Sequence, residues 1–399
     1  MRALARGDEL PADPPAVVFV SLPIGLGGST RSLANLLGYL DGEVTRVLAA
    51  PPGGRFVGLV ADTGRAEWHL PVVDDGQGMA VFRRARTAAR LAVALRRHRG
   101  RVAAVHANGF NELAAALPAA LLWRLPVVVW VHNFTRGRAV AVMSRVWRLL
   151  GRRVQLRWAA VSPLARDLVV DAGLAAAGDV VIVPNPIDAD DVVGPHVDGP
   201  AGEPPAVAFL GAPRDYKGFQ FLPELVEGVA EQEPVRWLLF TRQTDDHLPE
   251  VWDRLRALEA AGRLTVEGKV NDVRQAYARC DVVVCPSVQE SFCRVAAEAM
   301  LNGIPVVGSD LEPVRALLGD GDAGLLFPVG DVAAGAEAIV RLARDPGLRQ
   351  RLGDQGRARA AVFGGEPVRR AFLELLGETG RVSRAGSRTG GSGSPASSR

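Results

Sequence analysis

Two glutamates eight residues apart, Glu290 and Glu298, lie between two β-rich runs in the segment Pro286–Asp310. A strand is expected to end at Pro286–Ser287, and we expect a helix to begin near Ser291. Both carboxylates would then project from about the same face, ~12 Å apart at ~1.5 Å per residue. The free N–H groups of a first helical turn bind phosphate, and a carboxylate accepts hydrogen bonds from paired hydroxyls. A nucleotide-sized ligand could therefore contact both glutamates.

A second group of charged residues lies in the segment Phe209–Leu222, after the first strand expected in the second half of the chain. In Rossmann-type units, the loop after this strand binds the ligand. Arg214 and Lys217 lie in the loop, and either side chain can make a charge-assisted contact to a diphosphate. Solvent-exposed loop charges are the alternative interpretation for both.

Glycines and histidines mark the corresponding loops of the first half. The loop Ile24–Thr30 contains Gly27 and Gly28, which let the backbone approach a ligand closely before the next helix. The loop lacks G-x-G-x-x-G spacing, so a dinucleotide site is disfavoured. His132 ends an expected central strand, at the edge where α/β proteins bind ligands, and a structural histidine is the alternative. His106 also ends a strand, and the sequence does not decide between the two roles.

These residues must be positioned by strands and helices that alternate along the chain. Short β-rich runs, such as Ala16–Pro23 and Pro126–Asn133, alternate with helical runs, which indicates parallel sheets in an α/β fold. A second series follows a segment rich in Pro, Gly and Asp. The last strand is expected at residues 304–310, and the last two helices at Val332–Asp345 and Pro367–Gly380.

We therefore predict two Rossmann-like domains whose parallel sheets face a central cleft. The Gly/Ser-rich tail is expected to be disordered. The predicted boundaries are a flexible leader at 1–15, the first domain at 16–188, a linker at 189–206, the second domain at 207–365, the C-terminal helix at 366–380 and the tail at 381–399.

The composition is that of a globular protein. The chain has 399 residues, of which 48% are hydrophobic and 23% charged. It lacks both a continuous apolar run of about 18 residues and a secretory signal, so a cytoplasmic location is expected. Cys280, Cys285 and Cys293 are odd in number and match no zinc spacing, so we expect buried thiols.

Positive charge is concentrated in the first half. Residues 1–188 contain 23 arginines and 14 acidic residues, which suggests an anionic partner such as a membrane surface or a phosphorylated acceptor. Two Arg-rich helices, expected at residues 82–101 and 139–153, could lie on the inner face of a membrane. A solvated face over a buried stripe is the alternative. Because no nucleic-acid motif accompanies the charge, nucleic acid is not an expected partner.

The segment around the two glutamates resembles a known family. E-x7-E followed by A-M-x-x-G-x-P-V-V, which here runs from Glu290 to Val307, is similar to the signature region of the retaining glycosyltransferases of family 4. That family has the GT-B fold, and the resemblance implies that the C-terminal helix could cross back to the first domain. The resemblance covers roughly residues 16–378 and is most specific in the second half. It implies that Glu290 contacts the hydroxyls of the donor sugar as a catalytic residue and that Glu298 contacts the ribose.

The resemblance also assigns loop residues. Lys217 matches the lysine of the family pattern G-R-x4-K-G, whereas Ala212 takes the place of its arginine, for which Arg214 could substitute. His132 corresponds to a family histidine near the transferred sugar and is implied to be catalytic. The family's E-G-F-G-L-V is replaced by a sequence without its two glycines. The residues implied at the donor are Gly27, Gly28, Arg214, Lys217, Ser291, Phe292, Cys293 and Glu298.

The resemblance implies that a sugar passes from a nucleotide-diphosphate sugar, such as a UDP- or GDP-sugar, to a hydroxyl acceptor with retention of configuration. The acceptor could be a glycan, a lipid-linked glycan or a small metabolite. No metal and no cofactor are implied. Two alternatives remain open: a nucleotide-sugar epimerase of similar fold, and a non-catalytic two-lobed sugar-binding protein. A two-domain dehydrogenase would need a glycine fingerprint that the chain lacks.

Overall fold

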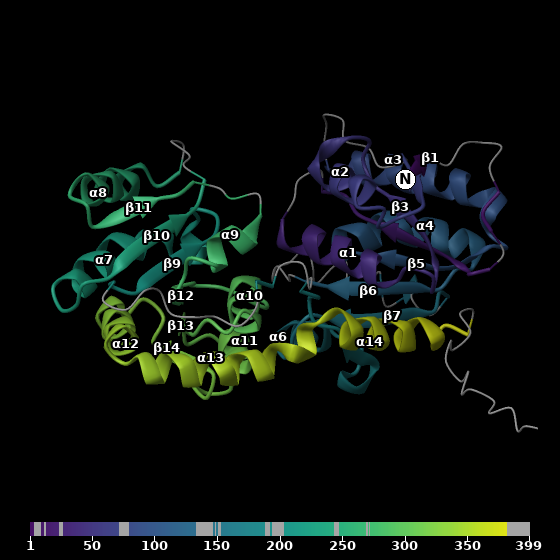
Figure 1. Cartoon of the computed structure of the whole chain (residues 1–399). Coiled ribbons are helices and arrows are strands. Elements are labelled where there is room, and N and C mark those ends of the chain that lie inside the picture. The colour runs from purple at the N-terminus through teal and green to yellow at the C-terminus, as the bar shows by residue number, and fades with distance from the viewer. Residues whose placement is uncertain are drawn as a thin grey trace, which may run out of the picture.

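The structure is a computed structural model that describes residues 1–3, 9–11, 13–23, 27–71, 80–132, 147, 149–150, 153–187, 192–193, 203–242, 247–268, 270 and 272–380. These residues form two α/β domains that lie side by side, each with its own parallel sheet (Figure 1). The α/β fold with two Rossmann-like domains, expected from the sequence, is therefore present.

Within the described residues, the first domain has an eight-stranded parallel sheet in the order β1-β4-β3-β2-β5-β6-β7-β8. Its central strands are rich in Val and Ala and are buried throughout, as parallel strands between two helical layers require. The strand order reverses between β2 and β5, and a ligand crevice opens at such a point. The strands are β1 (Arg2–Ala3), β2 (Ala16–Val20), β3 (Thr45–Ala49), β4 (Trp68–Leu70), β5 (Val102–Ala107), β6 (Val127–Val131), β7 (Leu156–Ala160) and β8 (Val180–Ile182).

The second domain has a six-stranded parallel sheet in its described part, in the order β11-β10-β9-β12-β13-β14. Here the order reverses between β9 and β12, so the loops after these two strands flank the crevice. Lys217 follows β9 and Glu290 follows β12. The strands are β9 (Ala206–Leu210), β10 (Arg236–Phe240), β11 (Leu264–Val266), β12 (Val282–Cys285), β13 (Val306–Ser309) and β14 (Gly324–Phe327).

Helices pack on both faces of each sheet (Figure 1). In the first domain α3 packs on α4, and α1 packs on α2 and α14; in the second, α7 packs on α12, and α10 on α13. The helices of the first domain are α1 (Gly28–Tyr39), α2 (Gly54–Asp62), α3 (Ala80–His98), α4 (Phe110–Trp123) and α6 (Pro163–Asp171). The later helices are α7 (Leu222–Ala230), α8 (Pro249–Ala260), α9 (Val273–Tyr277), α10 (Arg294–Leu301), α11 (Glu312–Leu318), α12 (Val332–Arg344), α13 (Pro346–Ala360) and α14 (Gly365–Gly377).

The segments that connect the domains contact each other. After β8, the chain leaves the first domain through residues 183–187, and the N–H of Ile187 donates to the carbonyl of Phe363 at 2.9 Å. Two side chains of α1 hold the same segment. Asn35 donates to the carbonyl of Pro186 at 3.2 Å, and the hydroxyl of Tyr39 donates to that of Ile187 at 3.2 Å. The connection is therefore fixed to the first domain by α1.

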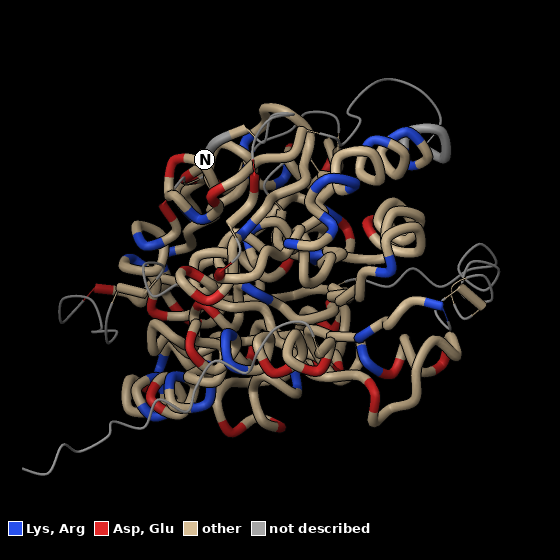
Figure 2. The backbone as a smooth tube through the Cα atoms, turned by 90° about the vertical axis from the view of Figure 1, so that its right-hand side faces the viewer, with Lys and Arg blue, Asp and Glu red and all other residues tan. Residues whose placement is uncertain are grey.

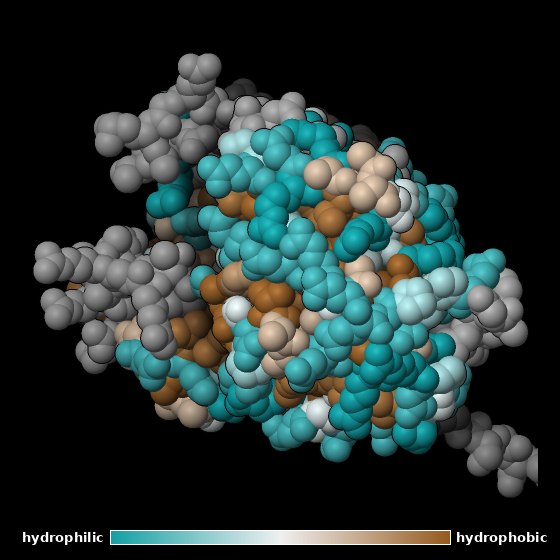
Figure 3. Space-filling model, turned by 90° about the vertical axis from the view of Figure 1, so that its left-hand side faces the viewer, coloured by the Kyte–Doolittle hydropathy of each residue, from teal (hydrophilic) through white to brown (hydrophobic). Residues whose placement is uncertain are grey.

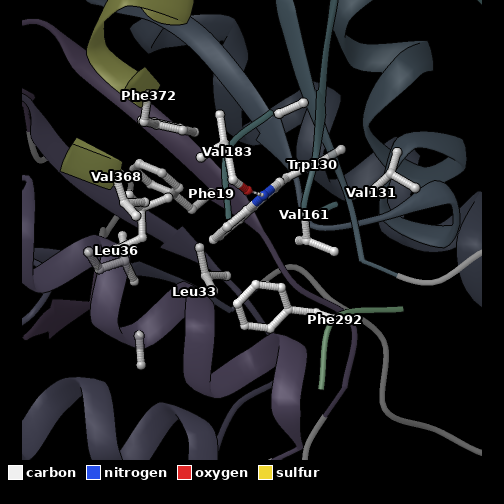
Figure 4. Packing of buried hydrophobic residues seen from close by; sticks show 14 of the residues in the cluster. Phe19, Leu33, Leu36, Trp130, Val131, Val161, Val183, Phe292, Val368 and Phe372 are labelled. Carbon is white, nitrogen blue, oxygen red and sulfur yellow. Dashed lines mark hydrogen bonds between the residues drawn. The ribbon is translucent and has the colours of Figure 1, made fainter. Parts of the chain in front are cut away.

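The final helix, α14, returns to the first domain, where it lies below the sheet in yellow (Figure 1). Phe372 stacks on Phe19 with ring centroids 6.3 Å apart, and Val368 points into the same cluster (Figure 4). A Cβ on Gly365 would come within 1.9 Å of the Tyr39 ring, so the approach of the helix to α1 requires glycine. The last helix thus completes the core of the first domain.

Several elements differ from those expected. The expected leader contains β1, which pairs with β4, so it is not wholly without structure. The strands β4 and β14 and the helices α2, α11 and α13 were not anticipated, and the final helix begins at Gly365 rather than Pro367. Most of the Arg-rich helix expected at 139–153 lies outside the described residues, as does the tail.

The surface is mostly polar. Basic and acidic positions are interspersed over the backbone (Figure 2), and hydrophilic residues cover most of the described outer face of the second domain (Figure 3). Among the helices that are described, none has the length and apolar character needed to span a membrane.

Candidate active site

A cavity of about 1000 Å³ lies between the two domains. Its walls come from the loops at the carboxyl ends of β2, β6, β8, β9 and β12, from α6 and from the start of α10. This volume suits a ligand of nucleotide-sugar size. The lining residues are Gly27, Gly28, Ser29, His132, Leu164, Leu168, Asn185, Tyr216, Lys217, Gln289, Glu290, Ser291, Phe292, Cys293 and Arg294.

Eight of the ten predicted site residues, all of which lie in the described part of the chain, line this cavity. The other two do not. Arg214 is exposed on the loop after β9, and Glu298 is buried, 4% exposed, behind the cavity wall. The structure therefore brings together loops that are more than 250 residues apart in the sequence, but Arg214 does not line the cavity that they form. The eight lining residues are Gly27, Gly28, His132, Lys217, Glu290, Ser291, Phe292 and Cys293.

Lys217 and Glu290 form an ion pair in the cavity wall, with Nζ 2.6 Å from Oε1. The hydroxyl of Ser287 donates to the same oxygen at 2.9 Å. Burial is the largest single effect on the pKa of Lys217 and lowers it, but the attraction and hydrogen bond of Glu290, together with smaller effects of Cys293 and Cys285, outweigh burial and raise the pKa. The lysine is therefore a cation at neutral pH, next to a carboxylate that faces the cavity.

Close contact between two loops positions this pair. Gly218, next to Lys217, has a φ of +71°, and a Cβ there would come within 1.7 Å of the carbonyl oxygen of Pro286. Only glycine allows both this conformation and this approach. The N–H groups of Val288 and Gln289 donate to the carbonyl of Tyr216 at 2.9 and 3.1 Å. The loops after β9 and β12 thus form one unit.

The helix after Glu290 begins three residues later than expected. It is α10, which starts at Arg294 because Cys293 has a φ of +65°, a left-handed value incompatible with a right-handed helix. Glu290 therefore lies in the loop, and the expectation that it shares a helix face with Glu298 is wrong. A left-handed non-glycine residue is uncommon and is concentrated at functional sites. Ser291 and Phe292 line the cavity from this loop.

Glu298 and Arg294 form a second ion pair, one helical turn apart on α10. Nε of Arg294 donates to Oε1 of Glu298 at 2.6 Å, and the Tyr277 hydroxyl donates to Oε2 at 2.8 Å. Burial of Tyr277 and the adjacent Glu298 carboxylate raise the pKa of that hydroxyl well above its usual value. Arg294 and Tyr277 were not anticipated from the sequence, because only the folded chain brings Tyr277 under α10.

His132 is held between two asparagines. Its Nδ1 lies 3.0 Å from Oδ1 of Asn185, and its Nε2 lies 2.8 Å from Oδ1 of Asn108. Burial lowers the pKa of His132 to about 3, so the ring is neutral at pH 7 and donates from one nitrogen. The amide nitrogen of Asn108 already donates to the carbonyl of Ser29 at 3.4 Å. A neutral ring carries one N–H, so it donates to only one of the two asparagine oxygens at a time.

The environment of His132 bears on the role predicted for it. Because both ring nitrogens face protein groups, a catalytic role would require one asparagine to yield its hydrogen bond to a substrate hydroxyl. The side chain of Asn185 thus contacts the histidine from the segment after β8. Asn108 was not anticipated, because a single asparagine after a strand carries no distinctive pattern.

His106, the other histidine at a strand end, is fully buried and does not line the cavity. Its ring packs against Phe19, Trp130 and Phe372. Burial, reinforced by His132, lowers its pKa to about 3. The structure therefore favours a structural role for His106 over a role in ligand binding. The three cysteines, all described, are buried thiols without a disulfide, as expected.

Comparisons with protein families match both halves of the chain. Residues 26–191 match the family model described as Glycosyltransferase Family 4, and residues 204–345 match the model described as Glycosyl transferases group 1.

Curated relatives include phosphatidyl-myo-inositol mannosyltransferases of mycobacteria. The protein from Mycolicibacterium smegmatis is 31% identical over 345 residues, which cover 82% of this chain and 83% of that protein. The protein from Mycobacterium leprae is 33% identical over 63% of this chain and 66% of its own length. Among solved structures, Anabaena Alr3699/HepE in complex with UDP and glucose aligns with a TM-score of 0.74 at 20% identity, over 91% of this chain and 100% of that one.

Proposed function

The chain belongs to glycosyltransferase family 4, and we propose that it transfers a sugar from a UDP- or GDP-sugar to a hydroxyl acceptor with retention of configuration and without a metal ion. Glycosyltransferase activity follows from the family. The donor, the stereochemistry and the residue roles are proposals, and they rest on the geometry of the cavity.

The observation that carries the proposal is the Lys217–Glu290 pair in a cavity between two Rossmann-like domains. A nucleotide-diphosphate sugar offers phosphates to the lysine and sugar hydroxyls to the carboxylate, so both charges keep a partner when the donor binds. Lys217 then stabilises the negative charge that develops on the departing diphosphate, where electrostatic stabilisation matters most.

The neighbouring lining residues fit a donor. Gly27 and Gly28 have nothing within 4 Å of an added Cβ, so their backbone faces open space at the start of α1. Ser291, Phe292 and Cys293 supply the loop that leads into α10. We assign all five to donor binding, with Glu298 toward the ribose. Attack by the acceptor from the side of the leaving group accounts for retention.

The acceptor is proposed to be a glycan or a lipid-linked molecule that reaches the cavity from the first domain. The mycobacterial relatives are named for transfer to phosphatidyl-myo-inositol, which supports a lipid-anchored acceptor. The exposed surface of α3 and the turn after it is rich in arginine and would favour peripheral contact with an anionic membrane. The exposed arginines there are Arg86, Arg90, Arg96, Arg97, Arg99 and Arg101.

The test is a donor panel. UDP-, GDP- and ADP-sugars are screened for binding by thermal shift, and each ligand that binds is then assayed for hydrolysis and transfer. We expect one UDP- or GDP-sugar to raise Tm and to be hydrolysed slowly without an acceptor, in the presence of EDTA. Interconversion of free sugar nucleotides would instead indicate an epimerase, and binding without turnover on any acceptor would indicate a binding protein.

A further inference from the structure

Arg294 is a cation in the cavity wall that the roles assigned above do not use. Its guanidinium contacts three parts of the molecule. Besides the 2.6 Å bond to Glu298 on α10, Nη1 donates to the hydroxyl of Ser32 on α1 at 3.1 Å and to the carbonyl of Pro186 in the connecting segment at 3.2 Å. A side chain of the second domain thus bonds to the first domain and to the connection between them.

The same contacts keep Glu298 away from a ligand. Both carboxylate oxygens are occupied, one by Arg294 and the other by Tyr277, and the Glu298 side chain is 5% exposed. Arg294 lines the cavity in front of it. A ribose could reach the Glu298 carboxylate only after the guanidinium moves aside.

Moving a cation away from a buried carboxylate is costly unless both charges gain new partners. A nucleoside diphosphate provides them, because its ribose hydroxyls can donate to Glu298 while its phosphates accept from Arg294. A guanidinium binds phosphate through two parallel hydrogen bonds, which is among the stronger polar contacts in proteins. Arg294 opens α10, whose N-terminal end also favours a negative charge.

We propose that Arg294 exchanges partners when the donor binds: its guanidinium leaves Glu298, which binds the ribose, and takes the donor diphosphate. This inference rests on the proposed function. Arg294 would thereby provide a second diphosphate cation beside Lys217, a part that the sequence assigned to Arg214. Because the same guanidinium bonds to Ser32 and Pro186, donor binding would also change a contact between the domains.

The experiment measures binding of UDP and UMP, or GDP and GMP where the donor panel selects guanosine, by isothermal titration calorimetry. The ratio of the diphosphate affinity to the monophosphate affinity isolates the contact with the second phosphate. We expect Arg294→Leu to reduce this ratio by about 10- to 100-fold, as for loss of a charge-assisted phosphate contact. Arg256→Leu, which removes an exposed arginine paired with Asp253 on α8, should leave the ratio unchanged.

A second pair of variants guards against misfolding. Arg294→Leu leaves the Glu298 carboxylate buried without its guanidinium, so the double variant with Glu298→Gln is compared with Glu298→Gln alone. We expect Glu298→Gln to weaken the binding of both nucleotides equally. The added Arg294→Leu should then reduce the ratio of diphosphate affinity to monophosphate affinity. The proposal would be overturned by an unchanged affinity ratio in both Arg294 variants. It would also be overturned if the affinities for the diphosphate and the monophosphate fell by the same factor.

The remaining outcomes separate this inference from the proposed function. A reduced ratio in Arg214→Leu but not in Arg294→Leu would assign the second cation to Arg214 and overturn the exchange. Absence of nucleotide binding by the unmodified protein would contradict the proposed function itself, and the inference with it. Normal binding by the unmodified protein with an unaffected Arg294→Leu variant would leave the proposed function in place and reject only the exchange.

Discussion

At the scale of single residues, the carboxylate of Glu290 combines three properties. It lines the cavity, its side chain is 8% exposed, and one of its oxygens accepts hydrogen bonds from both Lys217 and Ser287. Its position is therefore fixed before any ligand arrives, and preorganisation of this kind lowers the cost of reaching the transition state.

We predict that Glu290→Ala abolishes sugar transfer, with kcat reduced at least about 100-fold, because the variant loses the group that orients the donor sugar. The fold should persist, since the side chain lies in a loop. Steady-state kinetics with the donor identified by the panel measure the loss, and near-ultraviolet circular dichroism checks the fold. Ser287→Ala, which removes only a supporting hydrogen bond, should cost far less. Full turnover by Glu290→Ala would refute the assignment.

A second residue with an unusual environment is Glu112, in the first turn of α4. It is 5% exposed and accepts a hydrogen bond from the N–H of Leu22 at 3.3 Å. Burial raises its pKa to about 7 from 4.5. Between these values the folded state holds more protons than the unfolded state, so stability falls as the pH rises from about 4.5 to 7.

We predict that Glu112→Gln stabilises the protein at pH 8, by up to about 3 kcal/mol, and has little effect at pH 4.5. The amide keeps an acceptor for Leu22 and removes the buried charge. Urea unfolding at both pH values gives the difference, and Glu374→Gln, an exposed change on α14, is the control. The same gain at both pH values would show that Glu112 does not ionise with a raised pKa.

Residue types in sequence patterns were sufficient to find Lys217 and Glu290, which lie 73 positions apart and pair in the structure. Each is next to a local signal, a glycine or a strand end. Arg294 is next to neither signal, and Asn108, although it lies between the end of β5 and Gly109, is a single asparagine without a distinctive pattern. Their importance comes from partners supplied by other elements, Ser32 in one case and His132 in the other, and a linear pattern does not record such partners.

At the scale of elements, the site depends on how the loops after β9 and β12 fit together. The alternation of strands and helices predicted both loops, and the parallel order of the strands brings them to one edge of the sheet. The start of α10 was misplaced, because a helical apolar pattern continues through Ser291 and Phe292 while the backbone at Cys293 is left-handed. The spacing of apolar residues in a sequence does not reveal the backbone angle φ of an individual residue.

We predict that Gly218→Ala separates these loops and weakens donor binding at least about tenfold. The methyl group would meet the carbonyl of Pro286 at 1.7 Å, in addition to the strain of a positive φ. Gly262→Ala is a matched control, because Gly262 has a φ of +70° but nothing within 4 Å of an added Cβ. Calorimetric titration with the donor nucleotide compares the two. Equal binding by both variants would contradict the close fit.

At the scale of the whole molecule, the two domains are joined by the contact between Ile187 and Phe363 and by α14. The division into two α/β series could be read from the sequence, since a Pro- and Gly-rich segment separates them. The return of the last helix to the first domain was expected only from the family resemblance, because the apolar stripe of that helix would suit either domain. Gly365, which admits the Tyr39 ring, is one of 44 glycines in the chain.

We predict that Phe372→Ala lowers the free energy of unfolding by roughly 3–5 kcal/mol, the usual cost of truncating a buried phenylalanine. Phe372 is fully buried against Phe19 and His106, although it belongs to the last helix. Arg370→Ala, on the exposed side of the same helix, should be close to neutral. Urea unfolding followed by circular dichroism measures both changes. A neutral Phe372→Ala variant would mean that α14 is dispensable for the first domain.

The return of α14 has a consequence for how the protein is made. A ribosome releases the chain from its N-terminus, so α1 and the first sheet emerge long before residues 365–377. The apolar face that receives Phe372 must remain uncovered while the entire second domain is synthesised. The domain that is translated first is therefore the last to be completed. Nascent chains that end before Gly365 should expose an apolar surface to which chaperones can bind.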